Sequence, residues 1–102
     1  MNDIGPTAAC MLTLRGELTF ASVNQVRDKF FHDIGSSQKD SVHVDLANIL
    51  RIDSAGLALM IEGIKLAKKK GKQLSYNNIP DSLRKLVTFY ALDAVLGFKL
   101  AV

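Results

Sequence analysis

The sequence has a single cysteine, Cys10, among its 102 residues. One cysteine forms no internal disulfide and no thiolate metal cluster, so we interpret Cys10 as a buried, reduced thiol. Long apolar runs are also missing, because the longest candidate, residues 57–64, contains Glu62 and is followed by lysines. A membrane-spanning helix needs roughly 18 apolar residues, so the sequence predicts no span. The first ten residues carry an acid and no long apolar stretch, which leads us to expect a cytosolic protein without a secretory signal.

Other absences limit the chemistry that the sequence predicts. It has no glycine-rich phosphate loop of the Walker type, so we expect no nucleotide hydrolysis. His32 and His43 fall on different predicted elements without metal-ligand spacing, which predicts no metal site and no bound cofactor. The net charge is only +3, and aromatic residues are scarce near the four lysines of residues 68–72, so nucleic acid is not an expected partner. We interpret these lysines as the favourable end of a helix, with lipid or nucleic-acid contact as the alternative.

Apolar content, in contrast, is ample. Hydrophobic residues make up 48% of the chain and charged residues 23%, a balance typical of a folded globular protein. A chain of this length has room for one continuous core but not for two. We therefore expect residues 1–102 to form a single domain.

The amino-terminal part predicts strand and then helix. Residues 9–18 alternate apolar and polar side chains, which indicates one or two short strands with Gly16 at a turn or bulge. Ser22 precedes Gln25 by three residues, a capping-box pattern. A helix over residues 22–34 is then indicated by apolar residues at helical spacing, and Gly35 ends it. These apolar residues are Val23, Val26, Phe30 and Ile34.

Alternation in SVHVDL, residues 41–46, predicts a central strand. Helical periodicity is strongest over residues 54–70, and Gly71 stands where a helix ends. A short strand over 72–77, a third helix beginning near Pro80, and a further helical turn with a packed tail in 92–102 complete the pattern. Strand, helix and strand in succession require a right-handed crossover and a parallel pair. We expect an α/β fold with a mixed central sheet of about four strands, flanked by three to four helices.

The residues DSAG precede the apolar run of the long helix. At such an end, Asp53 or Ser54 can cap the unpaired backbone N–H groups, which is worth about 1 kcal/mol. The same N–H groups and the helix dipole also favour a phosphate, either bound or attached to a hydroxyl. Gly56 permits close approach of a neighbouring backbone or of a partner. The residues alone leave both interpretations open.

Three segments, VDL, IDSAGLALM and LRKLVTFYAL, resemble the STAS domain, the fold of bacterial anti-sigma factor antagonists and of sulfate-transporter tails. The resemblance covers residues 9–96. In the antagonist branch it implies the pattern D-S-S-G, in which a kinase phosphorylates the serine before the glycine. Ala55 occupies that position here, so Ser54 is the remaining candidate for phosphorylation. A phosphorylation-driven anti-sigma factor antagonist is therefore the alternative function.

Within the family, D-S-A-G-L-A-L with a long helix ending in LAKKKG is most similar to the small cytoplasmic STAS subunit of Mla-type phospholipid ABC transporters. This resemblance implies a noncatalytic protein that binds the transporter's ATPase subunit in a complex with a membrane permease, peripheral at the inner membrane. Such a subunit supports assembly and activity of the complex, which maintains outer-membrane lipid asymmetry. Ser54 matches the motif hydroxyl.

The expected partner-binding residues surround that hydroxyl: Ser54, Ala55, Gly56, Leu57, Met60 and Ile61. Residues 57–61 carry more apolar surface than one buried stripe needs, so part of it is available to a partner. The alternative is that the protein's own core covers both sides of the helix.

Asp45 and Asp53 are candidates for an acid/base pair, because both could lie near the carboxyl end of the central strand, where α/β folds bind ligands. With no third catalytic group and no convincing nucleophile, we interpret both carboxylates as structural. Enzyme activity is not expected.

Overall fold

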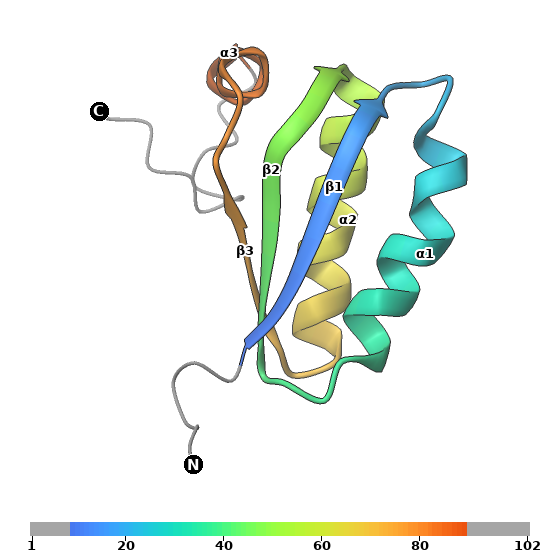
Figure 1. The fold of residues 1–102 in the computed structure, drawn as a ribbon, viewed down its shortest axis with the longest axis vertical. Helices are drawn as coiled ribbons and strands as arrows, with labels where there is room; N and C mark the ends of the chain where they lie inside the picture. Colours follow the sequence, from blue (N-terminus) through green and yellow to red (C-terminus); the bar gives the residue numbers. More distant parts are fainter. Residues whose placement is uncertain (1–8, 90–102) are drawn as a thin grey trace.

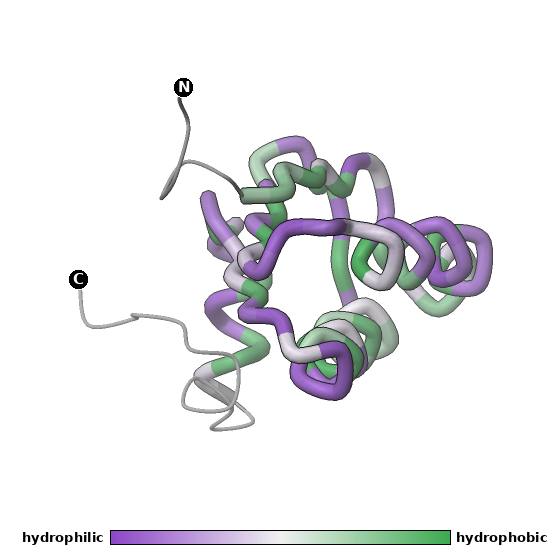
Figure 2. Tube along the Cα trace, turned by 90° about the horizontal axis from the view of Figure 1, so that it is seen from below, coloured by the Kyte–Doolittle hydropathy of each residue, from purple (hydrophilic) through white to green (hydrophobic). Residues whose placement is uncertain are grey.

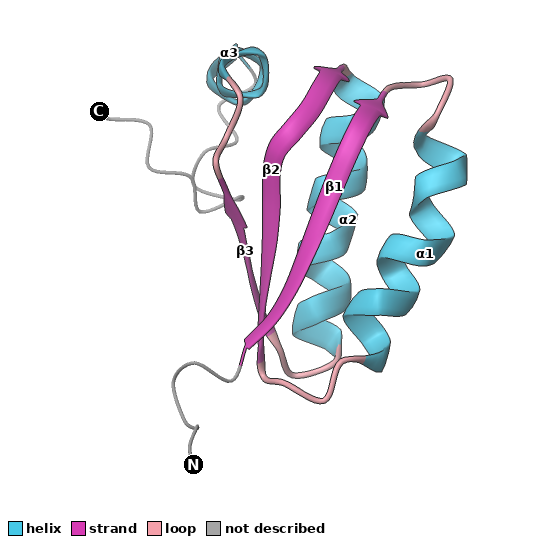
Figure 3. Cartoon of the chain, viewed as in Figure 1, coloured by secondary structure: helices cyan, strands magenta, loops and turns pink. Residues whose placement is uncertain are grey.

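A computed structural model of the chain describes residues 9–89 and arranges them as two successive strand–helix–strand units (Figure 1). The strands are β1 (Ala9–Leu18), β2 (Ser41–Ile52) and β3 (Gln73–Asn77), and the helices are α1 (Val23–Ser36), α2 (Ser54–Lys69) and α3 (Asp81–Phe89). In the sheet, β2 lies between β1 and β3, and both pairings are parallel. Helices α1 and α2 lie side by side beside the sheet, whereas α3 lies apart from α1 near the carboxyl-terminal end of β2 (Figures 1 and 3).

The expected α/β class is confirmed, with differences in the sheet. The described residues form three strands where about four were expected, and their two pairings are both parallel where a mixed sheet was expected. Residues 9–18 make one strand because the chain does not turn at Gly16. Its φ of +79° falls beside a register shift, so this glycine accommodates a bulge inside a continuing strand. The expected tail of residues 92–102 lies outside the described residues.

Alternation along β2 orients the sheet. Val42, Val44 and Leu46 are fully buried, while His43 and Asp45 between them are only half-buried. This pattern places one face of the strand in the core and the other towards solvent. The same face continues across the sheet, because Val44 pairs with Leu12 of β1 on one side and with Tyr76 of β3 on the other.

The helix boundaries follow the sequence pattern with two exceptions. Helix α2 ends at Lys69, and Gly71 has the positive φ of +73° typical of the residue that follows a helix. Helix α1 continues through Gly35, which was expected to end it. The capping box at Ser22 is also absent, because this side chain makes no cap hydrogen bond. Among the described residues, no helix is long and apolar enough to cross a bilayer.

Hydrophilic loops close the end of the molecule at which α2 finishes (Figure 2). Lys68 and Lys69 lie in the last turn of α2, where cations complement the helix dipole. The Lys72 ammonium donates hydrogen bonds to the carbonyl oxygens of Ser37 and Lys39, in the loop between α1 and β2. These contacts support the interpretation of the lysine cluster as a structural helix end. Cys10, expected to be buried, is half-buried in β1.

Candidate partner-binding site

Asp53 caps the amino end of α2. Its backbone is extended, and its Oδ1 atom accepts hydrogen bonds from the backbone N–H groups of Ala55 at 2.9 Å and Gly56 at 3.3 Å. These are two of the N–H groups that a helix start leaves unpaired. Of the two cap candidates, Asp53 therefore takes this role, and Ser54 is the first residue of the helix.

The second oxygen of Asp53 binds a different element. Oδ2 accepts a hydrogen bond from the backbone N–H of Phe20 at 2.9 Å, and the Asp53 N–H donates to the Leu18 carbonyl oxygen at 3.2 Å. The hydrogen bond from Phe20 is the largest influence that holds the pKa of Asp53 below its ordinary value; partial desolvation opposes it, and the bonds from Gly56 and Ala55 assist it. The ionised Asp53 side chain thus connects the start of α2 to the turn that follows β1 through hydrogen bonds.

Gly56 is required by the packing of α2 against β1. A Cβ atom at this position would lie 2.2 Å from the Leu18 carbonyl oxygen and 2.8 Å from Ile52 Cγ1. No side chain fits that space, so the glycine of the DSAG segment permits close approach of the protein's own backbone. Gly56 is buried in this packing.

Ser54 is exposed at the start of α2, and the structure gives its hydroxyl no hydrogen bond within residues 9–89. Ala55 is half-buried and packs against the core. We call residues 53–56 the α2 tip. Its one exposed side chain with a hydroxyl is Ser54.

Most apolar residues in the first half of α2 pack into the protein's own core. Leu57 is 3% exposed, and Leu59 and Met60 are fully buried. Ile61 is half-buried, and Ala58 is exposed. For Leu57 and Met60 the structure therefore favours the alternative in which the core covers the helix. In the first two turns of α2, residues 54–61, the exposed stripe of α2 consists of Ser54, Ala58 and part of Ile61.

Asp45 and Asp53 do not meet. Strand β2 is longer than expected and ends at Ile52, so the two aspartates are eight positions apart, which is roughly 26 Å of extended chain. Asp45 instead accepts hydrogen bonds from Asn78 Nδ2 at 2.8 Å and Ala47 N–H at 2.9 Å. The bond from Asn78, and then that from Ala47, holds the pKa of Asp45 below its ordinary value. The structure thus provides no acid/base pair at these positions.

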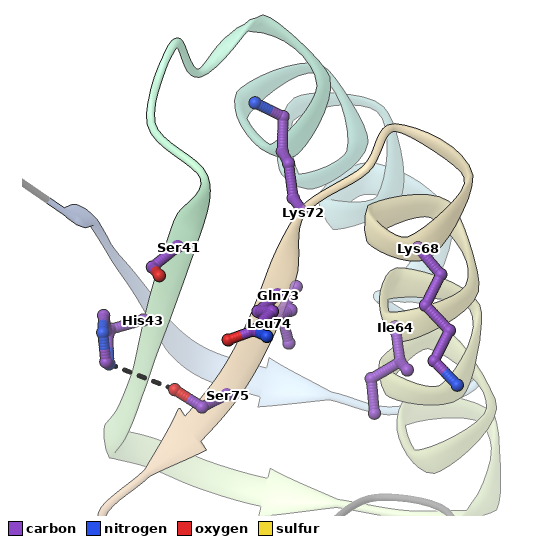
Figure 4. Close-up of a pocket in the computed structure, with 8 residues that line it drawn as sticks. All are labelled: Ser41, His43, Ile64, Lys68, Lys72, Gln73, Leu74 and Ser75. Atoms are coloured by element: carbon purple, nitrogen blue, oxygen red, sulfur yellow. Dashed lines mark hydrogen bonds between the residues drawn. The ribbon is translucent and has the colours of Figure 1, made fainter.

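A groove of about 360 Å³ lies along β3 and the later turns of α2 (Figure 4). His43 Nδ1 and Ser75 Oγ form a hydrogen bond of 3.1 Å between the paired strands β2 and β3, and Lys72 points away from both. Within the described residues, no group of three or more His, Cys, Asp or Glu side chains suits a metal ion. The groove is lined by Ser41, His43, Ile64, Lys68, Lys72, Gln73, Leu74 and Ser75.

Neither this groove nor a second one of about 410 Å³ between β1 and α1 includes any residue of the α2 tip. Ile64 is ten residues from Ser54, which is about 15 Å along a helix. The tip thus lines neither groove, and Ser54 is its exposed residue.

Sequence reasoning missed Phe20 as a member of this site. The structure places it in the turn between β1 and α1, 84% exposed and bonded through its backbone to Asp53. The available signal was an aromatic residue that fits neither the alternation of residues 9–18 nor the helical spacing that starts at Val23.

Parallel strand–helix–strand units and a capped D-S-x-G tip define a domain of the STAS type. The chain belongs to the STAS_2 family, described as "Mlab, STAS domain", whose model matches residues 5–98.

The chain is similar to two curated relatives, each called "Intermembrane phospholipid transport system binding protein MlaB", from Escherichia coli (strain K12) and Shigella flexneri. It is 37% identical to each over 51 residues, which are 50% of this chain and 53% of the relative. The matched part thus spans about half the length of these relatives.

Solved structures share the fold at lower identity. A sulfate transporter family protein from Wolinella succinogenes gives a TM-score of 0.71 at 16% identity, covering 93% of this chain and 76% of that one. The anti-sigma factor antagonist SpoIIAA in its unphosphorylated form gives 0.60 at 20% identity, covering 94% and 96%. These structural similarities establish the fold alone.

Proposed function

We propose that this chain is a noncatalytic STAS subunit of a phospholipid ABC transporter of the Mla type. It binds the transporter's ATPase subunit, in a complex with the membrane permease, on the cytoplasmic side of the inner membrane. By supporting assembly and activity of that complex, it contributes to outer-membrane lipid asymmetry. The partner contact is made through the α2 tip, led by Ser54.

The observation that carries this proposal is the exposed Ser54 on a tip that is rigidly capped by Asp53. A fixed backbone loses little conformational freedom on binding, which favours a docking role. The 37% identity to phospholipid transport system binding proteins covers 50% of this chain and supports a role in such a transport system. Asp45 and Asp53 are engaged in structural hydrogen bonds, which supports a noncatalytic role.

Affinity purification of the tagged chain from its native cells tests the proposal. We expect an ABC ATPase and its permease to be recovered together. Recovery of a protein kinase without any transporter component would contradict the proposal and favour a regulatory switch.

That switch is the second candidate, an anti-sigma factor antagonist, and the exposed hydroxyl of Ser54 is the observation that favours it. Phosphate on Ser54 would lie at a helix amino terminus, where the dipole stabilises negative charge. Ala55 in place of the family's acceptor serine argues against it. Intact mass after incubation with a cognate kinase separates the two: stoichiometric phosphate on Ser54 supports the switch, and an unchanged mass supports the transporter subunit.

A further inference from the structure

The exposed stripe of α2 lacks a large apolar side chain of its own. Leu57 and Met60 lie in the core, which leaves Ser54, Ala58 and half-buried Ile61 for a partner. In protein interfaces, a few large side chains contribute most of the binding energy, and aromatic residues are prominent among them. A docking surface at the tip therefore needs an anchor from a neighbouring element.

Phe20 is the exposed aromatic residue adjoining the tip. It is 84% exposed, and the other exposed large hydrophobics of the described chain are Met11 at 68% and Leu50 at 79%. Single exposed apolar residues are common on protein surfaces and need no explanation by themselves. Phe20 differs because its backbone N–H is bonded directly to the carboxylate that caps α2.

The turn that carries Phe20, residues 19–22, is fixed by further hydrogen bonds. The Thr19 N–H donates to Ser22 Oγ at 3.0 Å, and the Ser22 N–H donates to the Thr19 carbonyl oxygen at 2.9 Å. Ser22 Oγ in turn donates to the Glu17 carbonyl oxygen at 2.7 Å. The Ser22 hydroxyl thus holds the turn, and the Phe20 backbone is ordered before any partner arrives, which lowers the entropic cost of binding.

We propose that Phe20 is the apolar anchor of the α2 tip and inserts into an apolar pocket of the ATPase subunit, beside the contact made by Ser54. The identity of this partner rests on the proposed function. Asp53 joins the two halves of the surface, because one carboxylate holds both the start of α2 and the Phe20 turn. An aromatic centre beside polar groups is the usual composition of a protein interface.

Charge at this end of the molecule favours a protein partner over a membrane. Glu17 and Arg51 form an exposed pair at 3.9 Å between the ends of β1 and β2, and the ionised Asp53 lies beside Phe20. Arg51 offsets the charge of Glu17, so these three groups carry one net negative charge, that of Asp53 beside the anchor, which disfavours contact with an anionic bilayer. A rim of mixed charge around an apolar centre suits a protein surface.

Calorimetric titration of the full chain into the purified ATPase subunit tests this anchor. We expect Phe20→Ala to weaken binding by about 30-fold or more. Met11→Ala is the matched control, because it also removes an exposed large apolar side chain but from the other end of β1, and we expect its affinity to stay within about twofold. Thermal unfolding of both variants verifies that the fold is retained.

The outcomes separate the anchor from the proposed function. If Phe20→Ala binds as the unaltered chain does while Ser54→Lys binds weakly, Phe20 is not the anchor and the proposed function stands. If the unaltered chain does not bind the ATPase subunit, both are overturned. Sedimentation of the chain alone tests a second copy as occupant: a dimer that dissociates in Phe20→Ala would also overturn the anchor.

Discussion

The carboxylate of Asp53 and the backbone N–H of Phe20 are 33 residues apart in sequence and 2.9 Å apart in space. Through its other oxygen, the same side chain caps α2 at Ala55 and Gly56. One residue therefore fixes the beginning of a helix and the turn after a strand in the same arrangement. Its replacement should affect both.

Asp53→Ala should lower the free energy of unfolding by about 2 kcal/mol, because it removes the helix cap and the bond to Phe20. Asp53→Asn keeps an oxygen for the cap but places an amide where Phe20 N–H needs an acceptor, so we expect a loss of about 1 kcal/mol. Urea unfolding measures both values. Asp28→Ala, at an exposed position of α1, is the control and should change stability by less than about 0.5 kcal/mol. An Asp53→Asn variant as stable as the unaltered chain would contradict a contribution from the bond to Phe20, and equal losses in the two variants would contradict a separate contribution from the cap.

The contribution of Asp53 should also depend on pH. Because the hydrogen bond from Phe20 lowers its pKa below the ordinary 3.8, folding favours the ionised carboxylate. The resulting stability is fully present above the unfolded-state pKa and is lost as pH falls through the lower folded-state pKa. Unfolding of the unaltered chain and Asp53→Asn from pH 7 to pH 2 should show a difference that shrinks below about pH 4. A difference that stays constant to pH 2 would show that ionisation of Asp53 does not contribute.

Gly56→Ala should destabilise the protein by about 3 kcal/mol or more, because the new Cβ would lie 2.2 Å from the Leu18 carbonyl oxygen and force α2 away from β1. Gly35→Ala is a matched control inside α1. The nearest atom to the new Cβ would be Lys70 Cε at 3.6 Å, an ordinary contact, so helix propensity should make this variant neutral or more stable by about 0.5–1 kcal/mol. Thermal and urea unfolding compare the two. A similar response of both variants would mean that the close approach at Gly56 relaxes freely.

The sequence predicted the elements whose signals are local. Periodicity from Ser54 onward, the glycine at position 71 and the alternation of Val42, Val44 and Leu46 each depend on a few neighbouring residues, and each recurs in the structure. The strand–helix–strand order then required the parallel pairing that β2 and β3 form. Local signals and chain connectivity are sufficient for this much of the fold.

The site depended on contacts between distant residues, which a local pattern does not contain. Ser22 and Gln25 have the spacing of a capping box, yet the Ser22 hydroxyl accepts a hydrogen bond from the Thr19 N–H and donates one to the Glu17 carbonyl oxygen. The apolar run containing Leu57 and Met60 predicts burial but does not indicate whether the protein's own core or a partner supplies the cover. The exposure of Phe20 likewise follows from the path of its turn. Asp53, which directly follows the carboxyl-terminal end of β2, fixes this turn by a hydrogen bond.

Tyr76→Phe should cost about 1 kcal/mol of stability. The Tyr76 hydroxyl is buried and donates a hydrogen bond to the Met60 carbonyl oxygen at 2.7 Å, which links β3 to the middle of α2. Burial also raises the pKa of this hydroxyl, so the donor stays protonated. Urea unfolding measures the loss, and binding to the ATPase subunit serves as the second readout. Because Tyr76 is not part of the tip and contacts α2 at Met60, we expect unchanged affinity; a large loss of affinity would indicate that the position of α2 depends on this bond.

Ser54→Lys tests the tip directly. The long cation replaces a small exposed hydroxyl, so it should obstruct a closely packed partner and weaken binding to the ATPase subunit by at least about tenfold, or ~1.4 kcal/mol. A lysine at a helix amino terminus also opposes the dipole, at a cost of about 0.3–1 kcal/mol in stability. A suitable control must therefore include the same dipole penalty.

Ser82→Lys provides that control, because Ser82 is likewise exposed and lies in the first turn of α3 directly after an aspartate. Both variants should lose a similar, small amount of stability in thermal unfolding, since both place a cation at a helix start. Only Ser54→Lys should lose affinity in calorimetric titration with the ATPase subunit. If both variants bind equally well, Ser54 lies outside the interface; if both bind equally weakly, the loss comes from the added positive charge and not from the position of the α2 tip.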